Sequence, residues 1–291
     1  MLKHNSQEPT QPNRVVILGA TGFVGAETMR AFEIEGTETL ALGRAEIDLL
    51  DPQAESKLAR LLKPTDTFVV ISAEAPCKDA KMLIRNVQLM ISVCAAITQI
   101  QPAHVIYVSS DAVYADSMQP LTETSSAEPS SIHGIMHLSR ELMLKDAVKN
   151  ILAILRPTLI YGINDPHNGY GPNRFRRLAE IGEDIVLFGK GEEQRDHILV
   201  DDVAELIRLM AWYKSSGVLN AASGIIMSFK EVAKIIIKQS TSTVAIKETL
   251  RTGGMPHNGY RPFDSTATKV SFPKFRYTPL QDGLILSFHK N

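Results

Sequence analysis

The chain has 291 residues, of which 44% are hydrophobic and 22% are charged, and its formal net charge is -1. This length and composition fit a folded protein of one large or two modest domains, and the small net charge gives no reason to expect a nucleic acid as a partner. Two cysteines in unrelated contexts, Cys77 and Cys94, exclude a disulfide framework and fit a reducing cytoplasm.

The N-terminal segment, residues 1–13, is polar and lacks an apolar core. We therefore expect a flexible tail there rather than a signal peptide. No apolar run along the chain approaches the roughly 20 residues of a membrane helix, so we expect no membrane partner.

A glycine-rich turn follows this segment. Val15–Leu18 predict a buried parallel strand and residues 26–33 predict a helix, with three glycines between them at a spacing of three. In a strand–turn–helix unit of this kind, backbone N–H groups and the positive end of the helix dipole bind a pyrophosphate. The spacing G-x-x-G-x-x-G differs by one residue from the common dinucleotide fingerprint. We predict a dinucleotide site formed by Gly19, Thr21, Gly22, Phe23, Val24 and Gly25.

The next strand, predicted at residues 39–42, ends at Gly43-Arg44. In dinucleotide-binding folds this position lies beside the adenosine ribose. An acidic residue there hydrogen-bonds the 2′-hydroxyl of NAD, whereas an arginine accommodates the 2′-phosphate of NADP. Arg44 therefore favours NADP as the cofactor, with NAD as the alternative.

Strands and helices alternate through most of the chain, which predicts an α/β fold with a Rossmann-type doubly wound parallel sheet. Further strands are predicted at residues 68–71, 105–108 and 151–155, and helices at residues 52–62, 81–100, 133–149, 200–212 and 229–239. The pattern loosens around residues 163–195 and 251–264. We therefore assign residues 14–164 and 196–222 to a dinucleotide-binding domain, and residues 165–195 and 223–291 to a smaller C-terminal substrate-binding region.

Taken together, the motifs of this chain resemble those of the extended short-chain dehydrogenases/reductases, NAD(P)-dependent enzymes that epimerise, dehydrate or reduce nucleotide-linked sugars in carbohydrate biosynthesis. The resemblance spans about residues 14–283, and residues 41–73 are particularly similar to the dTDP-4-dehydrorhamnose reductases. It rests on the order and spacing of Gly19–Gly25, Ser72-Ala73, Asn86-Val87, Ser109–Tyr114, Arg156–Gly162, Arg195–Ala204 and Arg261–Asp264.

This resemblance implies two sets of ligand contacts. Arg195 and Arg261 would hold a nucleotide diphosphate, because the planar guanidinium group presents its donors in a fixed arrangement. Ser110 would contact the reacting carbon's oxygen, and Asp264 the nucleoside ribose. The implied substrate contacts are Ser110, Asp111, Asn173, Arg195, Arg261 and Asp264. The implied cofactor contacts, besides the glycine turn and Arg44, are Asp48, Leu49, Ser72, Ala73 and Asn86.

The resemblance breaks at the catalytic pair. The family has a tyrosine and, four residues later, a lysine in the helix after the Ser110 site, and this chain has His133 and His137 there. A tyrosine needs a neighbouring ammonium to lower its pKa from about 10, whereas an imidazole, with a pKa of about 6.5, needs none. We predict that His133 donates the proton and that His137, on the same helix face, binds the nicotinamide ribose. Tyr161 and Tyr170 are the alternative proton donors.

Other interpretations of the two histidines stay open. Both could pack in the interior without a chemical role. A pair at positions i and i+4 also suits a zinc-binding helix, but no third ligand is identifiable from the sequence, so we predict no metal.

The sequence thus predicts an NAD(P)-dependent oxidoreductase or epimerase of a nucleotide-linked sugar, with reduction of a keto-sugar slightly preferred. Dehydration is not expected, because Ala112 stands where a 4,6-dehydratase of this family has a glutamate. The alternative is a non-catalytic sensor or scaffold that binds NAD(P) or a sugar nucleotide in a degenerate active site. The resemblance also implies a homodimer paired through the helices predicted at residues 81–100 and 133–149. The apolar residues of the first are Met82, Val87, Met90, Ile91, Val93 and Cys94.

Overall fold

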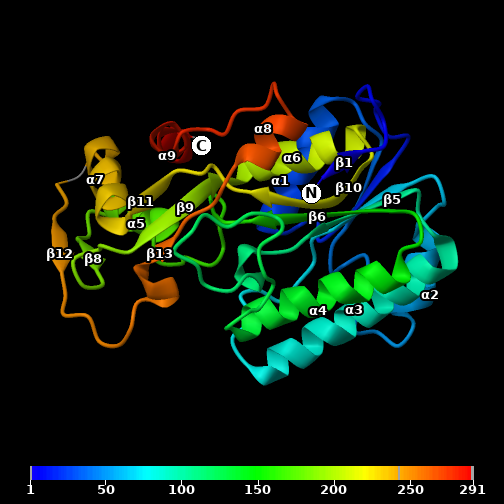
Figure 1. The fold of residues 1–291 in the computed structure, drawn as a ribbon, viewed down its shortest axis with the longest axis horizontal. Helices are drawn as coiled ribbons and strands as arrows, with labels where there is room; N and C mark the ends of the chain where they lie inside the picture. Colours follow the sequence, from blue (N-terminus) through cyan, green and yellow to red (C-terminus); the bar gives the residue numbers. More distant parts are fainter. Residues whose placement is uncertain (1, 242, 290–291) are drawn as a thin grey trace.

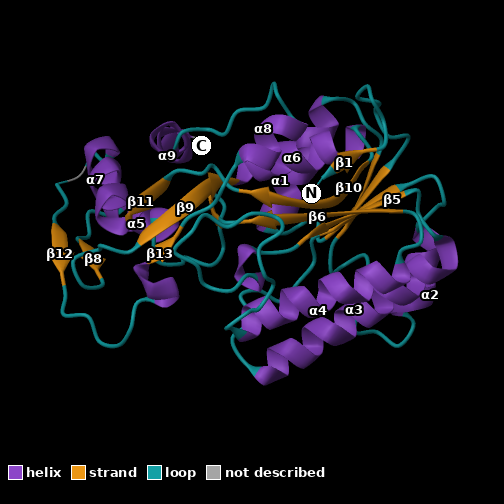
Figure 2. Cartoon of the chain, viewed as in Figure 1, coloured by secondary structure: helices purple, strands orange, loops and turns teal. Residues whose placement is uncertain are grey.

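Residues 2–241 and 243–289 are described by a computed structural model, in which seven strands form the main sheet (Figure 1, Figure 2). In chain order these strands are β1 (Lys3–His4), β2 (Val15–Leu18), β3 (Thr39–Leu42), β4 (Thr67–Val70), β5 (His104–Val108), β6 (Ile151–Pro157) and β10 (Ser215–Ala221). Their order across the sheet is β1-β10-β6-β5-β4-β2-β3, and every neighbouring pair is parallel except β1 with β10. The predicted doubly wound parallel sheet is confirmed.

Helices cover both faces of this sheet. One face carries α2 (Ala54–Leu61), α3 (Ala80–Ile100) and α4 (Ile132–Ala147), and the other carries α1 (Phe23–Ile34), α6 (Val200–Trp212) and α8 (Thr266–Ser271) (Figure 1). Because successive side chains of a strand point to opposite faces, Val16 and Leu18 of β2 pack under the first set of helices, and Val15 and Ile17 under the second. Burial on both faces explains why this strand is a continuous apolar run in the sequence.

The chain changes direction across the sheet at β2. From β2 it passes to β3 on one side and then returns to β4 on the other, so the carboxyl ends of β2 and β4 border a crevice of the kind that binds ligands in α/β sheets. Gly19, just after β2, has a φ of +94°, and a Cβ atom there would lie 2.7 Å from the backbone nitrogen of Ser72. The two strand ends therefore approach each other at a distance that only glycine permits.

A second, smaller sheet is built around β9 (Gln194–Leu199). It pairs β9 with β7 (Leu159–Tyr161), β11 (Ile226–Ser228) and β13 (Tyr260–Arg261), and a separate pair joins β8 (Ile185–Leu187) to β12 (Ile246–Glu248). The helices α5 (Pro172–Glu180), α7 (Phe229–Gln239) and α9 (Leu280–His289) lie beside these strands (Figure 1). Phe175, Phe229 and Ile236 belong to an apolar cluster of their own in this part of the molecule.

Some segments that we expected to be irregular are regular in the structure. α5, β8 and the start of β9 lie within residues 163–195, and β13 lies within residues 251–264 beside a short 3₁₀ turn, η2 (Pro256–Gly259). α5 buries Phe175 and Ala179 among arginines and a glutamate, a stretch too short and polar for hydrophobic periodicity to identify. Two strands that fall largely in the expected dinucleotide-binding range, β7 and β9, pair in the smaller sheet.

β1 lies within the segment that we expected to be a flexible tail. It pairs antiparallel with β10, and the ring of His4 stacks on Tyr213 with 4.6 Å between the ring centroids. The Nδ1 atom of His4 also lies 2.9 Å from the Oγ atom of Ser215. The tail prediction is therefore wrong for Lys3–His4, because the open edge of β10 offers backbone partners that the segment's own sequence does not reveal.

Among the described residues, α3 alone is long and apolar enough, by length and composition, to cross a membrane, which the sequence analysis did not anticipate. It lies between α2 and α4, and its inner face packs on the sheet as the face of a core helix does. Met90 and Val93, which we had counted as apolar surface, are fully buried there. Ile84 and Ile91, in contrast, are 59% and 55% exposed on the outer face.

Candidate active site

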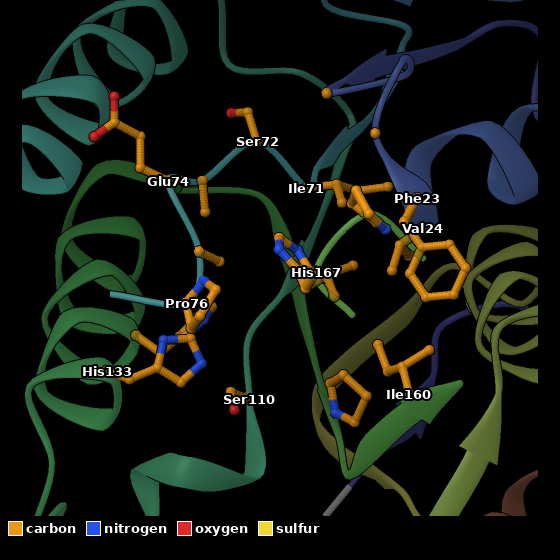
Figure 3. A pocket seen from close by; sticks show the side chains of 18 of the residues that line it. Phe23, Val24, Ile71, Ser72, Glu74, Pro76, Ser110, His133, Ile160 and His167 are labelled. Carbon is orange, nitrogen blue, oxygen red and sulfur yellow. The ribbon is translucent and has the colours of Figure 1, made fainter. Parts of the chain in front are cut away.

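A cavity of about 830 Å³ lies at the carboxyl ends of β2, β4 and β5 and extends to β7 and β9. Figure 3 shows part of its wall, with Phe23 of α1, Ser72 after β4, Ser110 after β5 and His133 of α4. We call the wall contributed by residues 18–137 the main-sheet half. The wall contributed by residues 157–257 is the small-sheet half.

All predicted residues of the glycine turn line the main-sheet half except Gly25. The lining residues are Gly19, Thr21, Gly22, Phe23 and Val24. A Cβ atom at Gly25 would lie 2.0 Å from the carbonyl oxygen of Gly19, so the role of Gly25 is to let α1 pack on the turn. A Cβ atom at Gly22 would meet only that same oxygen, at 3.3 Å, which is a tight contact, and no other atom of the described residues beyond its chain neighbours lies within 4 Å of that position.

The start of α1 suits an anion. Its first turn contains neither a capping side-chain hydrogen bond nor an acidic residue. The first N–H groups of the helix and its positive dipole end are therefore available to a bound phosphate. Together with the space beside Gly22, this arrangement fits the pyrophosphate of a dinucleotide.

The end of β3 brings together the predicted residues Arg44, Asp48 and Leu49 at the cavity wall. The Arg44 side chain is 76% exposed, and its NH2 atom lies 4.0 Å from the Asp48 carboxylate. The sequence analysis missed Glu46, whose Oε2 atom accepts the N–H of Gly43 at 2.7 Å. An acidic side chain is thus present at this strand end, held against the backbone.

The segment after β4 supplies Ser72 and Ala73 to the wall as predicted, while Asn86 lies behind them. Asn86 is fully buried, accepts the N–H of Glu74 at 2.9 Å and donates to the Glu74 carbonyl at 2.9 Å. It therefore holds the lining segment in place without lining the cavity. The carbonyl of Ser72 accepts a 2.5 Å hydrogen bond from the buried Arg140 of α4.

The predicted catalytic residues Ser110, His133 and His137 all line the cavity. Ser110 caps the 3₁₀ turn η1 (Asp111–Val113), with its Oγ atom accepting the N–H of Ala112 at 3.1 Å. A Cβ atom at Gly134 would lie 2.0 Å from the Ala112 carbonyl oxygen, so α4 begins in direct backbone contact with this turn. The missing side chain at Gly134 is what brings the Ser110 turn against the start of the helix that carries both histidines.

The two imidazoles pack edge to face, with 4.7 Å between their centroids. The Nδ1 atom of His133 accepts the N–H of Cys77 at 3.3 Å, so the neutral ring carries its proton on Nε2. The Nδ1 atom of His137 lies 2.9 Å from the hydroxyl of Tyr107, which anchors that ring in the interior.

Both histidines are harder to protonate than we expected. Burial lowers the pKa of His133 from 6.5, and His167 lowers it further while Asp111 opposes the shift. Burial, with His133 and Arg140 adding to it, holds the pKa of His137 well below 6.5. Both shifts disfavour the protonated ring, because α4 is covered more deeply than the sequence shows.

On the substrate side, Asp111, Asn173 and Arg195 line the cavity as predicted. Asn173 is fixed by its Oδ1 atom, which accepts the N–H of Gly162 at 3.0 Å. Arg195 is buried beside Glu193, with 2.7 Å between its NH2 atom and the carboxylate. This pair holds the guanidinium in a defined position on β9.

Arg261 and Asp264 are not among the residues that line the cavity. Arg261 is buried and donates to the Asp111 carboxylate at 2.9 Å and to the Asp111 carbonyl at 2.6 Å, so it holds the Ser110 turn in place. Asp264 is exposed and accepts the N–H of Thr266 at 2.7 Å, at the start of α8. The structure therefore places both where they shape the protein rather than the cavity.

The two alternative proton donors, Tyr161 and Tyr170, differ in position. Tyr170 lines the cavity, and its hydroxyl accepts the N–H of Phe188 at 3.0 Å. Tyr161 does not line it, and its hydroxyl is buried so tightly that a Cβ atom at Gly283 would lie 2.0 Å away. Burial raises the pKa of both hydroxyls, which makes them weaker acids.

The sequence analysis did not foresee how many histidines meet here. The cavity is lined by five of them, namely His133, His137, His167, His197 and His257. Within residues 2–241 and 243–289, no group of three or more histidine, cysteine or acidic side chains is arranged to hold a metal ion. The last three histidines are far apart in the sequence, so no spacing could have shown that they share a site.

Comparison with known proteins gives one family and a group of similar structures. A family model described as "NAD dependent epimerase/dehydratase family" matches residues 15–222. A dTDP-4-dehydro-6-deoxy-D-allose reductase from Streptomyces bikiniensis is 25% identical, with 77% of this chain and 80% of that protein covered.

Two solved structures illustrate the similarity of fold. A GDP-L-fucose synthetase from Naegleria fowleri bound to NADP has a TM-score of 0.81 and 17% identity, covering 98% of this chain and 95% of the other. A UDP-glucose 4-epimerase from Thermotoga maritima with UDP-glucose has a TM-score of 0.81 and 20% identity, covering 94% of this chain and 97% of the other. These similarities confirm the fold.

Proposed function

Because the chain belongs to the NAD-dependent epimerase/dehydratase family, we propose that it is an NAD(P)-dependent enzyme that acts on a nucleotide-linked sugar. The observation that carries this proposal is a single cavity that joins the glycine turn to Ser110 and His133 and then to Arg195. A dinucleotide in the main-sheet half and a nucleotide sugar in the small-sheet half would meet beside Ser110 and His133. The similar proteins bound to NADP and to UDP-glucose support this choice of ligands.

Reduction of a keto-sugar is the preferred reaction. The nicotinamide, when bound, supplies the hydride. Ser110 then orients the carbonyl oxygen, and His133 donates the proton that this oxygen needs when it becomes a hydroxyl. His137, fixed by Tyr107, binds the nicotinamide ribose from behind His133. The name of the Streptomyces bikiniensis relative, a reductase, supports this reaction.

NADP is the preferred cofactor, with NAD as the alternative. The proposal rests on Arg44, whose largely exposed guanidinium is free to reach a 2′-phosphate at the rim of the cavity. Glu46 is engaged with the backbone of Gly43, so it competes less for the ribose than a free carboxylate does.

The experiment that tests this function is turnover with a panel of 4-keto nucleotide sugars. Each is mixed with the full-length protein and NADPH or NADH, and oxidation of the reduced cofactor is followed by its absorbance. We expect NADPH to be oxidised with at least one keto-sugar, and a His133→Phe variant to lose that activity. Cofactor binding without oxidation across the panel would favour a sensor or scaffold, for which the replaced Tyr/Lys pair is the supporting observation.

A further inference from the structure

The strand β9 places His197 at the cavity wall, two residues from Arg195, the candidate for binding the diphosphate. Side chains alternate along a strand, so Arg195 and His197 project from one face of β9 and Asp196 from the other. Asp196 accordingly accepts hydrogen bonds away from the cavity, from Ser223 and Gly224, whereas Arg195 and His197 both line it. The small-sheet half therefore carries a guanidinium and an imidazole in adjacent positions.

His197 is buried and yet has no hydrogen-bond partner for its ring. Only 5% of its surface is exposed, and neither Nδ1 nor Nε2 makes a well-formed hydrogen bond to a described residue, although the Arg195 backbone lies close enough to affect the ring's pKa. Its ring packs edge to face on Phe229, with 5.6 Å between the centroids. Gly171 lies on the Nε2 side of the ring, where a Cβ atom would be in van der Waals contact with that nitrogen, at 3.8 Å, and would clash with the Phe229 ring at 2.9 Å. An unpaired buried polar group destabilises a protein, so these two nitrogens need partners from a ligand.

The protonation state of His197 limits what those partners can be. Burial and the nearby Arg195 charge lower its pKa to about 3, and hydrogen bonding to the Arg195 backbone opposes this shift. The ring is therefore neutral at physiological pH, with one nitrogen that donates and one that accepts. A diphosphate offers acceptor oxygens only, so it can satisfy the donor but not the acceptor. A sugar bears hydroxyl groups that both donate and accept.

We propose that His197 recognises hydroxyl groups of the sugar in a nucleotide-sugar substrate and thereby sets which sugars the enzyme accepts. This inference rests on the proposed function. His197 lies two residues further along β9 than Arg195, roughly 7 Å closer to the start of α6, the helix that follows β9. If Arg195 holds the diphosphate, His197 lies at the point where the attached sugar extends toward Ser110. A site of this kind rejects analogues that lack the hydroxyl, because its buried nitrogens are then left unpaired.

The test compares the wild-type chain with His197→Phe and His197→Asn. Phenylalanine keeps the ring and removes both nitrogens, and asparagine keeps one donor and one acceptor. His104→Phe serves as the control, because His104 is also buried but lies in β5 outside the cavity. Calorimetry measures binding of UDP-glucose, dTDP-glucose and GDP-mannose to the NADP-loaded protein, each beside its own nucleoside diphosphate.

We expect His197→Phe to weaken the best-bound nucleotide sugar about 10-fold and its nucleoside diphosphate less than about 2-fold. His197→Asn should recover part of the loss, and His104→Phe should bind as the wild type does. The melting temperature of the ligand-free His197→Phe variant should be equal to or higher than that of the wild type, because two unpaired polar atoms are removed.

Equal weakening of sugar nucleotide and diphosphate would overturn the inference, since His197 would then contact phosphate. Unchanged binding of both would overturn it as well, since the histidine would then be structural. A wild-type chain that binds none of the three sugar nucleotides would instead overturn the proposed function, and the inference with it.

Discussion

The two halves of the cavity are built in different ways. The main-sheet half uses backbone: an absent Cβ at Gly22, the close approach of Gly19 to Ser72, and the N-terminus of α1. The small-sheet half uses side chains from distant segments, such as Arg195 and His197. A ligand site made of backbone groups is formed by a few consecutive residues. A site made of side chains from distant segments forms only when particular strands pair. The glycine turn could therefore be identified from its own spacing, whereas Arg195 was predicted only through the family resemblance and His197 was not predicted as a site residue.

The loss of His133, the proposed proton donor in the main-sheet half, should have the largest effect. Replacing His133 by phenylalanine removes the proton donor, and general acid catalysis typically contributes about 10²- to 10⁴-fold, so turnover of the keto-sugar should fall on that scale. Cofactor affinity should stay nearly the same, as measured by calorimetry. His133→Gln, which retains an acceptor for the Cys77 N–H, controls for damage to that contact. If His133→Phe is fully active and Tyr170→Phe is inactive, Tyr170 is the proton donor instead.

The backbone construction of the main-sheet half can be tested at two glycines. Gly22→Ala places a methyl group 3.3 Å from the Gly19 carbonyl oxygen, a far milder contact than at Gly25, so we expect a small decrease in melting temperature and a dinucleotide affinity about 10- to 100-fold lower, through lost contacts to phosphate. Gly25→Ala forces a methyl group against the Gly19 carbonyl, so it should lower the melting temperature itself. A Gly22→Ala protein that binds the cofactor normally would contradict this assignment.

Part of the fold and site was predictable, and the limits are physical. α6 was predicted over the same residues that form it, Val200–Trp212, because its buried positions follow the helical period. The function of Arg261 was not predictable, because pairing of β13 with β9 brings its guanidinium to Asp111 rather than into the cavity. The burial of His133 depends on packing between segments and likewise has no local signature in the sequence.

The pH dependence of turnover should reflect the pKa of His133, which burial lowers. Its pKa lies below 6.5, and the acid is the protonated ring, so the active form is complete below that pKa and is lost above it. Turnover in keto-sugar reduction should therefore fall as pH rises through this pKa, about 10-fold per pH unit above it. A profile recorded at saturating substrate checks this. A rate that is constant or rises over the same range would show that the neutral ring acts only as a hydrogen-bond donor.

The choice between NADPH and NADH should depend on one contact of moderate strength, made by Arg44 at the rim of the cavity. Arg44→Ala removes one exposed guanidinium, so NADPH affinity should fall about 10-fold while NADH affinity stays constant. Glu46→Gln is the matched variant at the same strand end, and it should leave the preference for NADPH in place. Titrations of both cofactors into both variants measure this. Tighter binding of NADH by the wild type, unchanged in Arg44→Ala, would reverse the assignment.

The smallest effect is expected far from the cavity, in self-association. We propose a homodimer that pairs through α3 and α4, whose outer faces expose Ile84, Ile91, Ile135 and Leu142. Ile84→Glu with Ile91→Glu should yield monomers in light scattering, since a standard interface buries only about 800 Å² per partner. Ile34→Glu, an equally exposed substitution on the opposite side of the sheet, should leave the dimer intact. A wild-type monomer at tens of micromolar would refute the dimer.

The contact between Gly134 and the Ala112 carbonyl has a consequence for how such a site evolves. Because backbone meets backbone there, the contact between the Ser110 turn and the start of α4 does not itself depend on which side chains stand at positions 133 and 137. Point substitutions can then exchange one proton-donating side chain for another without a change in the backbone that positions it. Under the proposed function, the two histidines are an exchange of this kind, and the backbone contact does not require the proton donor to be a phenol.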